Sequence, residues 1–216
     1  MKAEVEQAIR DGRVVAIIRG YDPDVCLHLA EAYAAGGIRA VEVTYVQADR
    51  ALWKKTTAAI AAIRERFSAE LHVGAGTVLN SEQLAMTRDA GGEFMVAPNV
   101  KPALVRECVG FGMAAVPGAL TPTEVVDAWE AGASFVKIFP AGRMGPAYVK
   151  DLRAPLAHIP MLAVGGITPD NAADFIKAGC SGVAVSGALT RREMIEAGQW
   201  KQIADIARTL VERTRT

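Results

Sequence analysis

The chain has 216 residues, and 51% of them are apolar, which is enough for one compact domain, residues 1–216, with a sizeable core. This length excludes both a short peptide module and a long modular assembly. The 24 Lys and Arg residues balance the 24 Asp and Glu residues, so no net positive charge attracts nucleic acid or an anionic membrane. An anionic ligand must therefore be bound by local groups.

The cysteines and the amino terminus indicate the compartment. Three cysteines are too few and too widely spaced for a disulfide framework, and no pair has the spacing of metal ligands. Residues 1–10 lack the apolar core of a signal peptide, and no apolar run approaches the length of a membrane span. We expect a soluble cytoplasmic protein with three buried, reduced thiols: Cys26, Cys108 and Cys180.

In chain order, short runs of β-branched and apolar residues alternate with helical patterns from one end to the other. A helix follows each run, so the connections are parallel, and this order favours a closed (β/α)8 barrel, the TIM barrel. An open doubly wound sheet is the alternative, because periodicity gives the order of elements but not closure. The eight predicted strands are residues 14–18, 40–44, 71–74, 94–97, 113–116, 135–139, 161–164 and 182–185.

Proline marks several helix starts. Thr121 and Thr168 each place a capping oxygen before a proline, which suits the first helical position. Thr121 and Glu124 also have the spacing of a capping box. Near the end of the chain, residues 195–210 predict an amphipathic closing helix with three side chains on its core side: Ile203, Ile206 and Leu210.

The active site of such a barrel lies at the carboxyl ends of its strands. Residues that are unusual for a strand or for the turn after it gather at these positions in the sequence. These residues form a short polar set, together with glycines that allow a ligand to approach the backbone closely. The candidates at this end are Arg19, Glu42, Thr77, Pro98, Lys137, Gly165, Gly166, Ser186 and Gly187.

Glu42 and Lys137 break the ordinary rules of burial. Each lies between two β-branched residues, in strands that should be buried on both faces. Alternation along a strand directs those neighbours to the helices and the two charged groups into the barrel. There, the charged groups must shift their pKa values, find a partner, or both. One interpretation is a buried Lys–Glu ion pair without a catalytic role.

The other interpretation is catalytic. Burial lowers the pKa of a lysine amine, which frees the amine as a nucleophile. Such an amine attacks a ketone to form a Schiff base, and the iminium accepts electrons while a carbon–carbon bond one position away breaks. Glu42 then carries protons during the dehydration and to or from the departing hydroxyl. Together the two residues favour an aldolase mechanism.

Motifs from about residue 14 to residue 189 resemble those of one known family, in constant order. This family comprises the class I pyruvate aldolases that act on 2-keto-3-deoxy-6-phosphogluconate, 2-keto-3-deoxy-6-phosphogalactonate and 4-hydroxy-2-ketoglutarate. Singly, the glycine pairs are weak signals, but the motifs together are specific. They are VAIIR at 15–19, VEVT at 41–44, GAGTVL at 74–79, AP at 97–98, VKIFP at 136–140, GP at 145–146 and VGGI at 164–167.

The resemblance implies roles for the site residues. Lys137 would form the Schiff base and Glu42 would be the general acid and base. Thr77, Pro98 and Phe139 would line the pyruvate half of the pocket. The resemblance further implies a barrel that assembles as a homotrimer and uses neither a metal nor an organic cofactor. The sequence itself also offers no metal cluster, because its histidines are isolated and suit solvent-side or packing roles: His28, His72 and His158.

Departures from the family pattern bear on the substrate. The phosphogluconate branch usually has an arginine four residues after the catalytic glutamate, where this chain has Val46. Arg19 would then bind the substrate carboxylate, an arrangement that resembles the phosphogalactonate branch, as does Val164 in place of threonine. At the phosphate end, Gly165, Gly166 and Gly187 suit backbone capture, but Ser186 precedes Gly187, where the family commonly has the reverse order.

We therefore expect an aldolase that cleaves a 2-keto-3-deoxy-6-phospho sugar acid, of the galactonate or gluconate type, to pyruvate and glyceraldehyde 3-phosphate. An aldolase for 4-hydroxy-2-oxoglutarate or for an unphosphorylated sugar acid is the first alternative. A non-catalytic barrel that binds a phosphosugar acid is the second, and an isomerase or epimerase that uses carboxylate bases is the third.

Overall fold

The computed structural model describes residues 1–67 and 70–215. Within them, nine strand segments run parallel in a single sheet, in the order β5-β4-β3-β2-β1-β9-β8-β7-β6. The two segments at the ends of this order, β5 and β6, are separated in the chain only by Pro117, so they are halves of one barrel strand. The sheet is therefore closed, which confirms the predicted (β/α)8 barrel and excludes the open sheet.

The strands lie close to their predicted positions. The largest differences are a shift of β3 by one to two residues, and the break at Pro117, which has no N–H to donate to a neighbouring strand. The strands are β1 (Val14–Arg19), β2 (Ala40–Thr44), β3 (His72–Gly76), β4 (Phe94–Val96), β5 (Ala114–Val116), β6 (Gly118–Ala119), β7 (Val136–Ile138), β8 (Met161–Val164) and β9 (Gly182–Val185).

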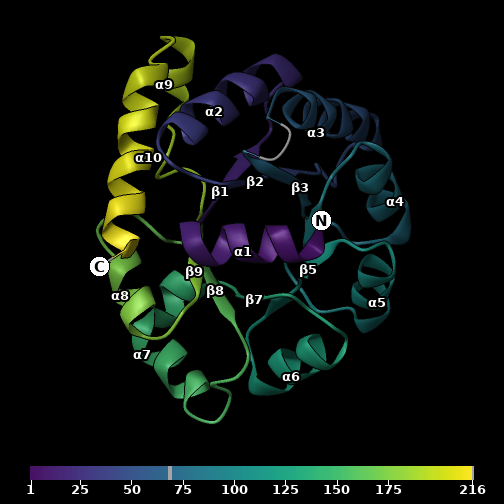
Figure 1. The fold of residues 1–216 in the computed structure, drawn as a ribbon, viewed down its shortest axis with the longest axis vertical. Coiled ribbons are helices and arrows are strands. Elements are labelled where there is room, and N and C mark those ends of the chain that lie inside the picture. The colour runs from purple at the N-terminus through teal and green to yellow at the C-terminus, as the bar shows by residue number, and fades with distance from the viewer. Residues whose placement is uncertain (68–69, 216) are drawn as a thin grey trace.

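Helices surround the ring of strands, as Figure 1 shows. The helices are α1 (Lys2–Gly12), α2 (Pro23–Ala35), α3 (Trp53–Phe67), α4 (Ser81–Asp89), α5 (Pro102–Gly110), α6 (Pro122–Glu130), α7 (Ala141–Arg153), α8 (Ala172–Lys177), α9 (Arg192–Glu196) and α10 (Trp200–Arg215). A short 3-10 turn, η1 (Arg50–Leu52), precedes α3.

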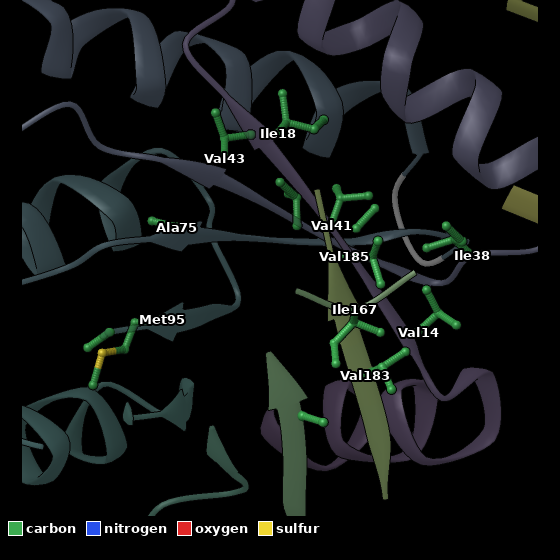
Figure 2. Close-up of a cluster of buried hydrophobic side chains, with 14 of the residues drawn as sticks. Val14, Ile18, Ile38, Val41, Val43, Ala75, Met95, Ile167, Val183 and Val185 are labelled. Atoms are coloured by element: carbon green, nitrogen blue, oxygen red, sulfur yellow. The ribbon is translucent and has the colours of Figure 1, made fainter. Parts of the chain in front are cut away.

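The core has two layers, because successive side chains of a strand point to opposite faces. Val41 and Val43 of β2 belong to the outer layer between strands and helices, part of which is shown in Figure 2. Ala40 of the same strand belongs to the inner layer, inside the barrel, with Phe135 and Leu162. This alternation directs the side chain of residue 42 into the barrel.

Helix α1 was not predicted, and it crosses the ring of strands in Figure 1. Val5 and Ile9, one helical turn apart, are buried in the inner layer of the core. The guanidinium of Arg10 lies 5.1 Å from the centre of the Phe135 ring. Phe135 precedes β7, at the amino ends of the strands, so α1 closes the end of the barrel opposite to the predicted active site.

Of two predicted helix starts, one is confirmed and the other differs in the structure. Thr121 and Glu124 form the predicted capping box, but no helix begins at Thr168. There the backbone N–H of Thr168 donates to the side-chain oxygen of Asn171, which makes a turn, and α8 begins only at residue 172.

The predicted closing helix consists of two helices. Gly198, with a φ of 63°, separates α9 from α10. Ile203 and Leu210 of α10 are buried as predicted, and Ile206 is partly buried against the same core. Within residues 1–67 and 70–215, none of the helices has the length and apolar character needed to cross a membrane.

The three cysteine thiols are free and buried, as predicted. Burial raises the pKa of each thiol to about 12, so the nucleophilic thiolate is scarce. We expect that a thiol reagent at mildly alkaline pH modifies none of Cys26, Cys108 and Cys180 in the native protein. All three should react in denaturant, as counted by mass spectrometry, whereas rapid native labelling would contradict their burial.

Candidate active site

Two strands that are separated by three others in the sheet, β2 and β7, direct Glu42 and Lys137 into the barrel, as the sequence predicted. Glu42 of β2 lies in register with Ile17 of β1 and Gly74 of β3. Lys137 of β7 lies in register with Leu162 of β8. The exposed fractions of Glu42 and Lys137 are only 2% and 6%, so both ionisable groups are removed from bulk water.

Burial shifts the pKa values of both groups toward their neutral forms. It raises the pKa of Glu42, and the positive charges of Lys137 and Arg19 oppose this shift. It lowers the pKa of Lys137, with Arg19 acting in the same direction and Glu42 opposing it. In the described part of the chain, no direct ion pair joins Glu42 to Lys137, and Oε2 of Glu42 is buried without a hydrogen-bond partner. The geometry therefore disfavours a simple structural ion pair.

A cavity of about 450 Å³ opens at the carboxyl ends of the strands. Every candidate from the sequence lines it except Glu42, which lies buried within β2. The sequence analysis did not name Ile17, Ile167 or Thr168 as site residues, and they also line the cavity. The predicted residues on its wall are Arg19, Thr77, Pro98, Lys137, Phe139, Val164, Gly165, Gly166, Ser186 and Gly187.

Close packing around Glu42 requires a glycine at position 76. A Cβ atom on Gly76 would lie 2.5 Å from Oε1 of Glu42 and 2.6 Å from Cγ2 of Thr44. Such distances are too short for any side chain, so only glycine lets the carboxyl group lie across β3. The missing side chain at position 76 therefore leaves the space that the Glu42 carboxyl group occupies.

The aromatic ring of Phe139 lies beside the amine of Lys137. The Nζ atom of Lys137 is 4.9 Å from the ring centre. A Cβ atom on Gly165 would lie 3.0 Å from two ring carbons, so the glycine also leaves room for this ring. Phe139 thus forms an aromatic wall next to the amine, and its ring face attracts the ammonium form, so this contact works against the lowering of the Lys137 pKa by burial.

Glycines expose backbone at the far end of the cavity. Gly165 and Gly166 have φ values of 88° and 74°, which glycine adopts readily, and a Cβ atom on Gly187 would have nothing within 4 Å. A second cavity of about 440 Å³ shares the Gly165–Gly166 pair and includes Arg143 of α7, a residue that the sequence did not single out. This end of the site therefore combines accessible backbone with a cation.

The histidines lie outside this cavity. His72 is buried, with Nδ1 3.1 Å from Oε1 of Glu93, and His28 and His158 pack against tryptophan rings. In the residues that the structure describes, His, Cys, Asp and Glu side chains form no group of three or more that could hold a metal ion.

Arg19 influences both ionisable groups, so its removal is testable by pH. Its positive charge lowers the pKa values of Lys137 and Glu42, and Arg19→Met should therefore raise both. We expect both limbs of the plot of kcat/KM against pH to move to higher pH. If Arg19 binds the substrate carboxylate, KM rises about ten- to a hundredfold as well. Unchanged limbs would contradict this electrostatic coupling.

The fold and this cavity define a class of protein, a (β/α)8 barrel with a buried lysine amine in the wall of its central cavity. The family model for KDPG and KHG aldolase matches residues 5–206. The chain belongs to this family of aldolases, as its sequence motifs led us to expect.

Individual relatives agree with the family assignment. The 2-dehydro-3-deoxy-6-phosphogalactonate aldolase of Escherichia coli is 39% identical, with 82% of this chain and 84% of the relative covered. The 2-dehydro-3-deoxy-phosphogluconate aldolase of Treponema pallidum is 33% identical, with 95% of both chains covered. A solved structure of native KDPGal is 37% identical, has a TM-score of 0.83, and covers 94% of each chain.

Proposed function

We propose that the chain cleaves a 2-keto-3-deoxy-6-phospho sugar acid to pyruvate and glyceraldehyde 3-phosphate through a Schiff base on Lys137. The observation that carries this proposal is the lysine amine, buried in the wall of the central cavity, with a pKa below its ordinary value. Family membership supports an aldolase, and the geometry supplies a nucleophile for it.

The reaction follows from the two buried groups. The Lys137 amine attacks the C2 ketone, and loss of water leaves an iminium. The Glu42 carboxylate removes the C4 hydroxyl proton while the C3–C4 bond breaks, so the aldehyde leaves and an enamine remains. Glu42 then returns the proton to C3. Water hydrolyses the new iminium, which releases pyruvate and restores the amine.

The positive charge of Arg19 suits the substrate carboxylate. Arg19 lines the cavity at the end of β1, and a guanidinium fixes both the charge and the orientation of a carboxylate. We assign Thr77, Pro98 and Phe139, which line the same cavity, to the pyruvate half of the site.

The galactonate-derived substrate is the epimer that we favour. Val46 and Val164 depart from the phosphogluconate branch, and the galactonate relative reported above has the higher identity, 39% against 33%. Side-by-side kinetics on the two phosphosugar acids should give the larger kcat/KM for the galactonate type. Val164→Thr should reduce that preference by about tenfold, since one such swap in a pocket has effects of this size. A preference for the gluconate type would overturn this choice.

We assign the substrate phosphate to the end of the cavity formed by Gly165, Gly166, Ser186 and Gly187, with Arg143 nearby. Accessible backbone N–H groups and a cation are suited to a phosphate dianion. The phosphorylated substrate should therefore turn over far faster than its unphosphorylated analogue. Equal turnover, or a preference for 4-hydroxy-2-oxoglutarate, would favour the alternative aldolase activities.

A non-catalytic phosphosugar-binding barrel is distinguished by chemical trapping. Borohydride reduces an iminium between pyruvate and Lys137 to a stable secondary amine, which increases the mass of the chain. An unchanged mass would support the non-catalytic barrel.

We further propose a cytoplasmic homotrimer of single-domain chains. Sedimentation should then give three chains per particle, and calorimetry should give one unfolding transition.

A further inference from the structure

Thr77 has a backbone conformation that threonine rarely adopts. It follows β3 directly, lines the central cavity, and has a φ of 58°, in the left-handed region. The branched Cβ of threonine makes this region costly, and such conformations persist only where the surroundings enforce them. Some other part of the structure must therefore hold the Thr77 turn in place.

Two glutamine side chains connect this turn to the core. Nε2 of Gln47 donates a hydrogen bond of 2.6 Å to the carbonyl oxygen of Thr77. Oε1 of Gln47 accepts a hydrogen bond of 3.0 Å from Nε2 of Gln83. Oε1 of Gln83 in turn accepts a hydrogen bond of 2.8 Å from the backbone N–H of Leu79, two residues after Thr77. The turn is thus bound on both sides by one pair of carboxamides.

Gln83 is a firm anchor for this connection, because its side chain is fully buried in α4. Its backbone carbonyl also accepts a hydrogen bond of 3.1 Å from the hydroxyl of Tyr45, which follows β2. A buried glutamine is uncommon and must have its polar atoms satisfied. Here the satisfied atoms link the segment after β2 to the segment after β3.

We propose that Gln47 and Gln83 are positioning residues that hold Thr77 in the conformation that binds the pyruvate carboxylate. This inference rests on the proposed function. Gln47 has to donate to Thr77 and accept from Gln83 at once, which a carboxamide can do and an ionised glutamate cannot. Since Val46 supplies no positive charge, carboxylate binding depends on Arg19 and on an accurately placed Thr77.

The test measures borohydride trapping of pyruvate at increasing pyruvate concentration. Gln47 is exposed, so Gln47→Met removes its hydrogen bonds without opening the core. We expect the pyruvate concentration for half-maximal trapping to rise about tenfold in Gln47→Met and Gln47→Glu, because a positioning contact is lost. The maximal trapping rate should stay within about twofold, since the amine is untouched.

Arg50→Gln is the matched control. Arg50 pairs with Glu82, and this ion pair joins the same two segments at the surface without touching Thr77. Loss of this ion pair should leave the pyruvate concentration for half-maximal trapping unchanged. An equal effect of Arg50→Gln would show that general loosening, and not the carboxamide pair, causes the change, and would overturn the inference.

A double-mutant comparison isolates the role of Thr77. In a Thr77→Ala background, Gln47→Met should change the pyruvate concentration for half-maximal trapping by less than about twofold, because the contact that Gln47 positions is already absent. A further tenfold rise there, or no rise in the single variant, would overturn the inference while leaving the proposed function intact. Failure of the unmodified protein to trap pyruvate would overturn both.

Discussion

Lys137→Met should abolish aldolase turnover and at the same time raise the melting temperature. Loss of the nucleophile removes the covalent route, so kcat/KM should fall about a thousandfold or more. Burial lowers the pKa of Lys137 in the folded protein. At pH values below the pKa of a lysine in the unfolded chain, burial of this group therefore lowers the free energy of unfolding. Methionine avoids this penalty, and its thioether fits an apolar setting. Kinetics and thermal unfolding on the same sample check both expectations.

Lys137→Arg tests the rival mechanism, because arginine keeps the positive charge but is not a nucleophile at these pH values. We expect near-total loss of activity and no mass gain with pyruvate and borohydride. Lys150→Met, on the exposed surface of α7, is the matched control and should retain full activity. Substantial activity in Lys137→Arg would contradict the Schiff base and favour an isomerase or epimerase that uses carboxylate bases.

The sequence was sufficient for the barrel and for the two buried ionisable residues. Alternating strands and helices predict the order of elements, and a charged residue between β-branched neighbours in a buried strand is conspicuous, as at Glu42 and Lys137. Helix α1 was missed because Val5 and Ile9 form only a short apolar pattern. Their role is visible only in the folded barrel, where they are buried at the end that α1 closes.

Contacts between residues distant in the chain were beyond prediction. The approach of Glu42 to Gly76 and that of Phe139 to Gly165 depend on strand register, which periodicity does not fix. Gln47 and Gln83 look like surface polar residues in the sequence, and only the fold brings them together at Thr77. Sequence reasoning therefore identified the reactive groups but not the packing that positions them.

Glu42→Gln should separate proton transfer from Schiff-base formation. The amide keeps the shape of the carboxyl group but carries no proton between atoms, so aldol cleavage should slow about a hundred- to ten-thousandfold. The amine remains, and loss of the nearby negative charge lowers the pKa of Lys137 further. Pyruvate should therefore still be trapped by borohydride, and trapping should extend to lower pH.

The stability of this variant gives a second readout. Burial raises the pKa of Glu42 in the folded state. The free energy of unfolding is therefore highest below the pKa that Glu42 has in the unfolded chain, and it declines as pH rises through the pKa that Glu42 has in the folded protein. Glutamine removes this decline, and Glu42→Gln should melt at a higher temperature than the unmodified protein at neutral pH. Glu65→Gln, on the exposed face of α3, is the control and should change neither property. Full activity in Glu42→Gln would show that another group carries the proton.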